Sequence, residues 1–238
     1  MKQIVWIGRS KADLKEFPDR VQRSVGFALW GAQEGEIPPS SKVLKGFGNA
    51  KVREIIENNS NGTFRVVYTV EFKGYIAVLH AFQKKSKSGI ATPQQEMELV
   101  KKTFSRSKKN SEGNRMKKKK LGDVEYEIGS GNVFADLGLA NPEEALAKAQ
   151  LAWEIAKIIK KRKLTQKRVA AILKITQPKV SLLLRGYLKS FSMERLFRFL
   201  NDLGQDIYIK ITPSSHRGHG STIIGDSPSN ARIAALGK

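Results

Sequence analysis

Residues 164–186 read LTQKRVAAILKITQPKVSLLLRG, and this stretch decides the fold of the C-terminal part of the chain. Apolar residues recur at helical spacing on both sides of the short segment 174–176, which predicts helices at 165–173 and 177–185 joined by a tight turn. Pro178 fits this scheme because the first turn of a helix tolerates proline. The pattern predicts a helix-turn-helix with a core of Val169, Ala170, Leu173, Val180, Leu183 and Leu184.

The second predicted helix presents polar side chains outward. Glutamine can bind adenine through two hydrogen bonds, and lysine can bind guanine or a phosphate, so such side chains suit the major groove of DNA. We therefore expect DNA contacts from Gln177, Lys179, Ser181 and Arg185. The stretch resembles the Xre/phage-repressor family in its LTQ…A…L…I…Q..VS.L..G pattern, and the resemblance implies that Gln166 contacts a phosphate. A plain helical hairpin is the alternative interpretation.

Helical patterns continue on both sides of the motif. Asn141 and Pro142 predict a helix start, and a further helix at 192–203 ends at Gly204. The segment 206–211, DIYIKI, alternates strictly and predicts a strand. Residues 141–212 are thus expected to form an all-α helix-turn-helix domain with a C-terminal strand, followed by a disordered tail at 213–238.

The beginning of the chain carries strand patterns instead. Residues 64–72 (FRVVYTVEF) and 75–82 (YIAVLHAF) predict a hairpin that turns at residues 73 and 74. Alternation along the second strand places Ile76, Val78, His80, Phe82 and Lys84 on one face. With a strand at 2–7 and a helix at 14–33 interrupted by Pro18, residues 1–105 are expected to form a small antiparallel sheet with helices. The fold class is therefore α+β, with a basic linker at 106–120 and an acidic extended segment at 121–140.

Composition restricts the partners. The 238 residues include 43 Lys and Arg against 22 Asp and Glu, a formal net charge of +21, which favours a polyanion as the default partner. There are no cysteines and three histidines, so thiolate chemistry is excluded and neither a metal site nor a cofactor is expected. No signal peptide or membrane-spanning run is visible, and the expected location is the cytoplasm, with no membrane partner.

Basic and aromatic side chains cluster around the two predicted strands. An RNase without a metal needs a group that activates the 2′-hydroxyl, cations for the developing phosphate charge, and a proton donor. Lys, Arg, Tyr and His can supply all three, and the candidates are Lys45, Arg53, Arg65, Tyr68, His80, Lys84, Lys85 and Lys87. Alternatively, His80 is a structural histidine, the KKSK run is a solvated loop, and Tyr68 belongs to the core.

A second resemblance favours the catalytic interpretation. WIGRSKADLKEFP, KVLKGFGNAKVREI, FRVVYTV and above all VLHAFQKKSKSGIATP make residues 1–105 similar to the phage-derived HigB-like branch of the RelE toxin superfamily. The resemblance implies a compact sheet-and-helix fold that cleaves mRNA on the ribosome without a cofactor. Carried over by motif, Arg65 and the positions His80, Lys84, Lys85 and Lys87 are the better candidates; Lys45 and Arg53 are weaker ones. Arg65 with Lys84 or Lys85 would stabilise phosphate charge, and His80 would position or exchange a proton.

The acidic segment 121–140 suggests how the parts cooperate. It interleaves acids with apolar residues, so it could lie on the basic N-terminal part and cover its cations, or pack on its own helical domain. The C-terminal pattern also resembles HigA-like antitoxins, and toxin-first order resembles HigBA operons. The sequence therefore predicts a toxin–antitoxin pair in one chain, with ribosome-bound mRNA and operator DNA as partners, an intramolecular or swapped contact, and a homodimer that reads paired half-sites.

Two other interpretations remain open. The chain could be a transcription regulator whose toxin-like part has lost catalysis and serves for interaction. It could also be an engineered or readthrough product of two separate chains, since Met116 followed by four lysines looks like the start of a second reading frame.

Overall fold

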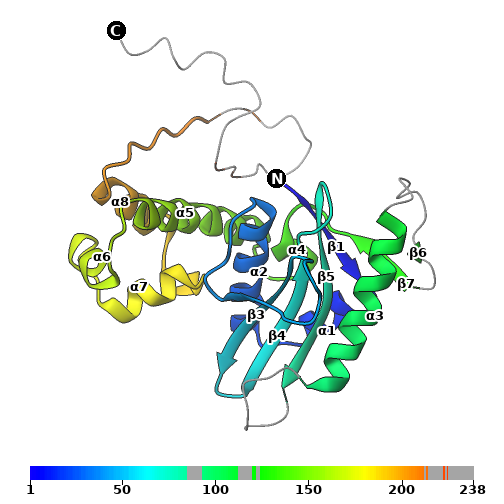
Figure 1. Ribbon diagram of the computed structural model, residues 1–238. Coiled ribbons are helices and arrows are strands. Elements are labelled where there is room, and N and C mark those ends of the chain that lie inside the picture. Colours follow the sequence, from blue (N-terminus) through cyan, green and yellow to red (C-terminus); the bar gives the residue numbers. More distant parts are fainter. Residues whose placement is uncertain are drawn as a thin grey trace.

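The computed structural model describes residues 1–84, 93–111, 120–121, 124–211, 213, 222 and 224. Within these, an α+β N-terminal half (residues 1–111) is followed by a helical half (residues 133–211), which confirms the predicted fold class (Figure 1). No helix among these residues is long and apolar enough to cross a membrane.

A seven-stranded sheet with the order β2-β3-β4-β5-β1-β7-β6 organises the N-terminal half. Only β1 and β5 run parallel among the paired strands, and the rest are antiparallel, so the sheet is mixed and the predicted fully antiparallel sheet is wrong in this one pair. The strands are β1 (Gln3–Ile7), β2 (Ser41–Val43), β3 (Val52–Asn59), β4 (Gly62–Thr69), β5 (Tyr75–Lys84), β6 (Lys120–Leu121) and β7 (Val124–Ile128). The predicted hairpin is present as β4 and β5, and Gly74 in its turn has a φ of 87°, which favours glycine.

Helices cover both faces of this sheet. On one face lie α1 (Ser10–Lys15) and α2 (Asp19–Gln33), which Pro18 separates as the sequence predicts. On the other face lies α3 (Gln94–Ser111), whose Val100 and Phe104 join an apolar cluster with sheet residues. The helix runs six residues into the predicted linker, because lysine, arginine and serine do not end a helix as glycine or proline would.

The helical half contains α4 (Val133–Asp136), α5 (Pro142–Lys161), α6 (Gln166–Ile172), α7 (Gln177–Leu184), the 3₁₀ helix η1 (Leu188–Ser190) and α8 (Met193–Asp202). The helix-turn-helix is α6 and α7, and Thr165 caps α6 by accepting a hydrogen bond from the Arg168 amide. Val169, Val180 and Leu183 are buried, as predicted.

The acidic segment lies on the N-terminal half. Strand β7 pairs with β1 in the register Val5↔Ile128, and so adds an edge strand to the sheet. Among the described carboxylates of the segment, Glu127 accepts a hydrogen bond from Lys11 over 2.6 Å. Further along, Asp136 of α4 accepts one from the Trp6 indole over 3.1 Å. The predicted docking is present, and these two acids pair with residues other than the predicted catalytic cations. Asp123, Lys85 and Lys87 lie outside the described residues, so the predicted cover of the cations stays a prediction.

Helix α2 is the surface on which the helical half packs. The Trp153 ring of α5 stacks on Phe27 with centroids 5.2 Å apart, and its indole nitrogen donates to the Phe27 carbonyl over 3.1 Å. A Cβ at Gly31 would lie 1.9 Å from Trp153, so only glycine admits the indole there. Gly186, after α7, lies against the Phe27 ring in the same way. These contacts merge the cores of both halves into one cluster.

Two local predictions are wrong. Residues 206–211 form no strand, since they have no neighbouring strand in the described part of the chain with which to pair. The prediction that Ile76, Val78, His80, Phe82 and Lys84 share one face of β5 is also wrong. The pairing of β5 with β4 shifts register between Val67 and Tyr68, which leaves Leu79 as an extra, bulged residue. Ile76 and Val78 consequently pack towards α2, whereas the later part of β5 turns its alternate side chains towards α3.

We predict that Gly31→Ala destabilises the chain. Alanine in a helix interior normally gains about 1 kcal/mol over glycine, but here its methyl group would overlap the indole and cost about 1–3 kcal/mol in total. Urea unfolding of the full chain measures the change. In a Trp153→Leu background the penalty should disappear; an equal penalty in both backgrounds would show that the indole is not its cause.

Candidate functional site

Three of the predicted catalytic side chains lie on one face of the β4–β5 ladder. Arg65 is directly opposite Phe82 on the neighbouring strand, and His80 and Lys84 flank Phe82 at alternate positions of β5. The bulge at Leu79 puts all of them on the side of α3, where the His80 imidazole stacks on the Phe82 ring at 5.2 Å. Neighbours in this pattern are about 5 to 8 Å apart, close enough for several to act on one phosphate.

Arg65 lies deep in this face. Its side chain is 3% exposed, and its Nη1 donates to Glu54 Oε1 over 2.8 Å. Glu54 is fully buried, and its second oxygen lies 3.5 Å from the Lys42 ammonium. A buried carboxylate needs such cations, because leaving it uncompensated costs several kcal/mol, on the order of 3–5 when one partner is removed. In this arrangement Arg65 supports the sheet, and its charge is already matched.

His80 has a carboxylate partner on the helix that covers the same face. Its Nε2 lies 2.5 Å from Glu96 Oε2 at the start of α3. A carboxylate bound to one ring nitrogen fixes the orientation of an imidazole and favours a proton on that nitrogen. The side chain is 13% exposed, so α3 both orients the ring and restricts access to it.

The other predicted catalytic residues lie elsewhere. Arg53 is on β3 but projects to the α2 side of the sheet, where it donates to Ser41 Oγ over 3.1 Å. Tyr68 is fully buried on that side, and burial raises its pKa above the ordinary value although Ser41 and Arg53 act in the opposite direction. Lys45 is exposed in the loop between β2 and β3. Lys85 and Lys87 fall outside the described residues.

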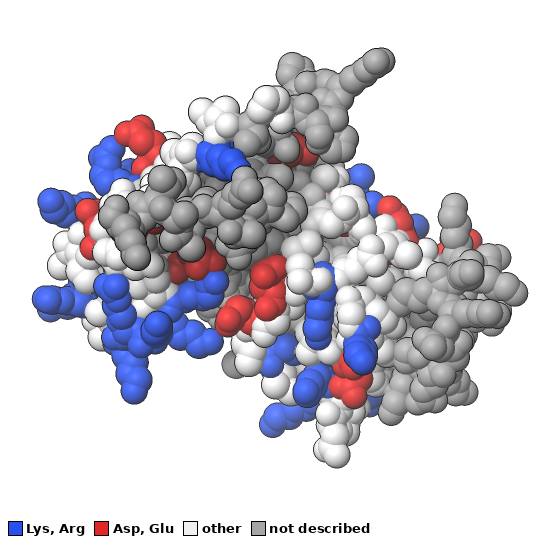
Figure 2. Space-filling model, turned by 90° about the horizontal axis from the view of Figure 1, so that it is seen from above, with Lys and Arg blue, Asp and Glu red and all other residues white. Residues whose placement is uncertain are grey.

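The helical half exposes most of the predicted DNA contacts. Gln166 at the start of α6 and Gln177 and Lys179 in the first turn of α7 are all exposed, whereas Ser181 is half-buried. Figure 2 shows lysine and arginine side chains gathered along the outer edge of the helical half, on the left of the view. Exposed cations around the end of α5 and along α6 are Lys160, Lys161, Arg162, Lys163, Lys167 and Arg168.

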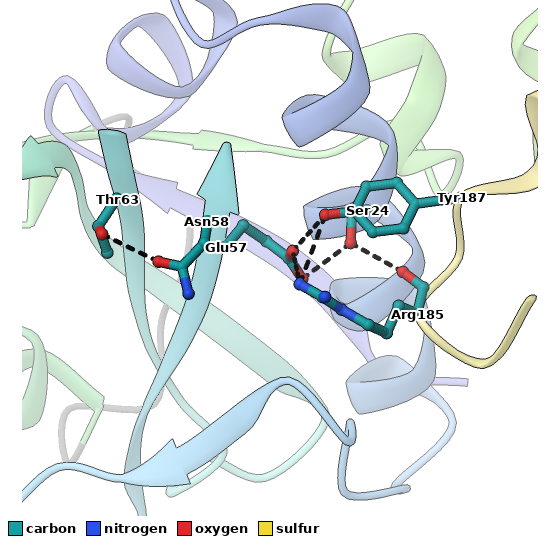
Figure 3. Close-up of polar contacts among 6 residues, drawn as sticks. All are labelled: Ser24, Glu57, Asn58, Thr63, Arg185 and Tyr187. Carbon is teal, nitrogen blue, oxygen red and sulfur yellow. Dashed lines mark hydrogen bonds and ion pairs between the residues drawn. The ribbon is translucent and has the colours of Figure 1, made fainter. Parts of the chain in front are cut away.

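Arg185 at the end of α7 is bound to the N-terminal half. Its Nη2 donates to Glu57 Oε2 of β3 over 2.7 Å, and the Tyr187 hydroxyl donates to the same oxygen over 2.6 Å (Figure 3). Ser24 Oγ of α2 lies 2.8 Å from both Glu57 Oε1 and the Arg185 carbonyl, and can donate its one proton to either. We call these four residues (Ser24, Glu57, Arg185 and Tyr187) the Glu57 cluster.

The Glu57 cluster joins the sheet, α2 and the recognition helix through one buried carboxylate. Glu57 is fully buried, while the Arg185 side chain keeps 40% of its surface exposed. Burial, and then the hydrogen bond to Glu57, raise the pKa of Tyr187, so the phenol stays protonated and keeps donating. The C-terminal end of α7 is thus fixed to the N-terminal half, and its N-terminal turn is left exposed.

A cavity of 880 Å³ opens beside this junction. Its walls combine Ser181 and Arg185 of α7 and Gln166 of α6 with residues of the N-terminal half such as Ile37 and Asn58. Three of the predicted DNA contacts therefore line a cavity shared with the other half of the chain. Among the described residues, no group of three His, Cys, Asp or Glu side chains could hold a metal ion.

The carboxylates that decide this arrangement were not among the predicted residues. Glu54 and Glu57 stand in VREIIENN, where alternation puts one on each face of an apolar strand, and acids on both faces of a central strand signal buried pairing. Glu96 gives no such signal, since an acid in the first turn of a helix is ordinary.

We predict that breaking the Arg65–Glu54 ion pair acts first on the stability of the fold and only then on catalysis. Arg65→Met leaves a buried carboxylate short of a cation and should lower the free energy of unfolding by about 3–5 kcal/mol. The pair variant Arg65→Met/Glu54→Leu removes both charges and should lose less than Arg65→Met alone. Urea unfolding of the parent chain and the two variants measures these free energies of unfolding. A pair variant less stable than Arg65→Met would contradict the structural role of the ion pair.

Comparisons with known proteins agree with this division of the chain. Residues 12–105 match the family described as phage derived protein Gp49-like, and residues 133–212 match a helix-turn-helix domain family. A solved chain titled "Putative XRE Family Transcriptional Regulator" is 38% identical over 36% of this chain and 96% of that chain, with a TM-score of 0.33. No curated protein matches. The chain therefore contains a region that matches Gp49-like phage-derived proteins, followed by a region that matches a helix-turn-helix domain.

Proposed function

We propose that this chain is a type II toxin–antitoxin pair in one polypeptide, of the HigB and HigA kind. The N-terminal half would be a ribosome-dependent mRNA endonuclease, and the helical half would keep it inactive while binding operator DNA to repress its own synthesis. The observation that carries the proposal is the convergence of Arg65, His80 and Lys84 on one face of β4 and β5, each held inside the chain. Ribosomes and operators both place this activity in the cytoplasm.

The proposed cleavage needs no metal. A base removes the proton from the 2′-hydroxyl, the oxygen attacks the neighbouring phosphorus, and the 5′-oxygen leaves with a proton from an acid. His80 is placed to exchange one of these protons, and Phe82 beside it offers an aromatic surface for a base. Lys84, with Lys85 and Lys87 next in the sequence, would stabilise the phosphate charge. Arg65 would add its positive charge to this site from its buried position in the sheet.

The toxin would be inactive in the joined chain because these side chains are already paired or covered. Glu96 accepts or shares the His80 proton, and Lys84 is 8% exposed. RNA must displace α3 from this face before it can meet the imidazole. Helix α3 contacts β6 as well as β5, and β7 pairs with β1, so docking of the segment that precedes the helical half would help to hold α3 in place. Release of that half would free the face.

The alternative is a DNA-binding regulator with an inactive toxin-like domain. The buried ion pair of Arg65 favours it, because a cation used in catalysis is usually accessible. The two proposals differ in one property: only the first predicts RNA cleavage when the halves are separated.

The first test compares full-length chains in a cell-free translation reaction, with cleavage of a reporter mRNA read by primer extension. The intact chain should cleave little, and Trp153→Ala should cleave because loss of the indole removes about 3–5 kcal/mol from the contact between the halves. Adding His80→Ala or Lys84→Ala should reduce that cleavage about 100-fold or more.

Trp153→Ala combined with Lys161→Ala is the matched control, since Lys161 is an exposed base far from the β5 face, and its cleavage should equal that of Trp153→Ala. If no Trp153→Ala chain cleaves, even at concentrations at which altered protease sensitivity shows that the halves have separated, the regulator with an inactive domain is the correct function.

The DNA-binding half of the proposal is tested with the duplex upstream of the coding sequence. Gln177→Ala should weaken binding by about 5- to 150-fold, because a bidentate contact to a base contributes about 1–3 kcal/mol. Lys179→Ala should reduce the slope of log affinity against log salt concentration by about one, because one fewer counterion is released on binding. Fluorescence anisotropy at several salt concentrations measures both, with a scrambled duplex as the reference. Equal affinity of the Gln177→Ala and parent chains for the upstream duplex would contradict base contacts from α7.

A further inference from the structure

The segment 206–211 after α8 is the most exposed apolar part of the described chain. Tyr208, Ile209 and Ile211 are 83%, 72% and 92% exposed, whereas Ile207 packs against the core of the helical half. Figure 1 shows the segment (orange) leaving α8 as an open chain. Three large apolar side chains within four residues are costly to keep in water, on the order of 1.5–3 kcal/mol for each that could be buried.

The backbone of this segment is equally without partners. In the part of the chain that the structure describes, no backbone hydrogen bond joins residues 206–211 to another segment. No ion pair involves Asp206 or Lys210 in the same part. Yet the sequence DIYIKI has the alternation and the β-branched residues of a strand. A strand sequence with free edges is a template for pairing with another chain.

The sequence of the segment is complementary to itself. If two copies pair antiparallel with Tyr208 opposite Tyr208, Asp206 of each copy faces Lys210 of the other, and Ile207 faces Ile209. One side of the ribbon then carries the tyrosine pair between two ion pairs, and the other side carries only isoleucines. Shifting the register by one residue would set Asp206 against Ile211 and Ile207 against Lys210, which mixes charged and apolar groups on both sides.

We propose that residues 206–211 form an antiparallel two-stranded ribbon with the same segment of a second copy of this chain, centred on Tyr208. The isoleucine side lies towards the helical halves, continuing the contact that Ile207 already makes with the core. Cross-strand pairs of opposite charge and of β-branched residues stabilise such a ribbon, and like charges in the same positions destabilise it.

A second copy fits this segment better than the free edge of the sheet does. The two outer strands of the described sheet, β2 and β6, are only three and two residues long, so neither can pair with six. A symmetric ribbon also relates two recognition helices by a two-fold axis, which a protein that reads paired half-sites requires. The use of the ribbon to place two recognition helices on DNA rests on the proposed DNA-binding function, but the contact between the two segments does not.

The first experiment uses the absence of cysteine from the chain. In the full chain carrying Tyr208→Cys, the two new thiols face each other across the two-fold axis, and oxidised glutathione should convert them to an intermolecular disulfide seen on a non-reducing gel. Ile209→Cys lies opposite residue 207 and should cross-link at least about tenfold more slowly. Lys189→Cys, exposed on η1, is the control for chance collisions. Equal rates for all three would overturn the ribbon, and a faster Ile209→Cys would overturn its register.

The second experiment exchanges the charges. Sedimentation equilibrium of the full chain should show a dimer, and Asp206→Lys or Lys210→Asp alone should raise its dissociation constant about tenfold or more, because each places two like-charged pairs in the ribbon. The double variant Asp206→Lys/Lys210→Asp restores both pairs and should return to within about threefold of the parent. A monomeric parent, or a dimer indifferent to the single changes, would overturn the proposal.

Neither measurement involves DNA or RNA. A failure of the ribbon would therefore leave the proposed toxin–antitoxin function standing. A failure of Gln177→Ala to weaken DNA binding would, equally, leave the ribbon standing.

Discussion

The stacking of Trp153 on α2 is the contact on which the rest of the structure depends. An indole can lie flat against a helix only where the helix lacks side chains, and Gly31 provides that gap beside the Phe27 ring. The indole nitrogen then reaches the Phe27 carbonyl. Once α5 is fixed there, Gly186 meets the same ring from the end of α7, and the helix-turn-helix is held at one angle to the sheet. Burial of these aromatic surfaces accounts for much of the cohesion between the halves.

The buried carboxylate of Glu57 makes this contact specific, since it binds Arg185 across the two halves. Within the N-terminal half, buried Glu54 binds Arg65 and partly exposed Glu96 binds His80, so each acid engages a residue whose sequence context indicates a nucleic-acid contact. Because a buried carboxylate without a partner is costly, Glu57 favours the joined arrangement of the halves. The net charge of +21 is therefore a poor guide to the surface, since part of it is used internally. Of the described DNA-contact candidates, Gln166, Gln177 and Lys179 stay exposed, as does the basic outer edge of the helical half.

The two ends of α7 consequently have different roles. Its C-terminal end is fixed by the Glu57 cluster, while its N-terminal turn presents Gln177 and Lys179 to solvent. Separation of the halves would release Arg185, since its ion pair with Glu57 spans the halves, whereas the β5 face is covered by α3 of the N-terminal half. Joining the two domains in one chain thus gives the contact between them influence over α7. The open segment 206–211 lies outside this contact and is available to a second copy.

The sequence by itself determined the local structure. Helical spacing, the Pro18 break, the turn at Gly74 and the Thr165 cap are effects of neighbouring residues, so the α+β class, the hairpin and the helix-turn-helix follow from the pattern. It also put His80 and Lys84 at alternate positions of one strand and Arg65 on its hairpin partner, because strand pairing and alternation are short-range rules. Only the tertiary structure decided the bulge at Leu79, the docking of β7 on β1 and the partners of Arg65 and Arg185. The reason is physical: a buried carboxylate binds partners that lie up to 130 residues away in the sequence, and no local pattern records which partner it will have.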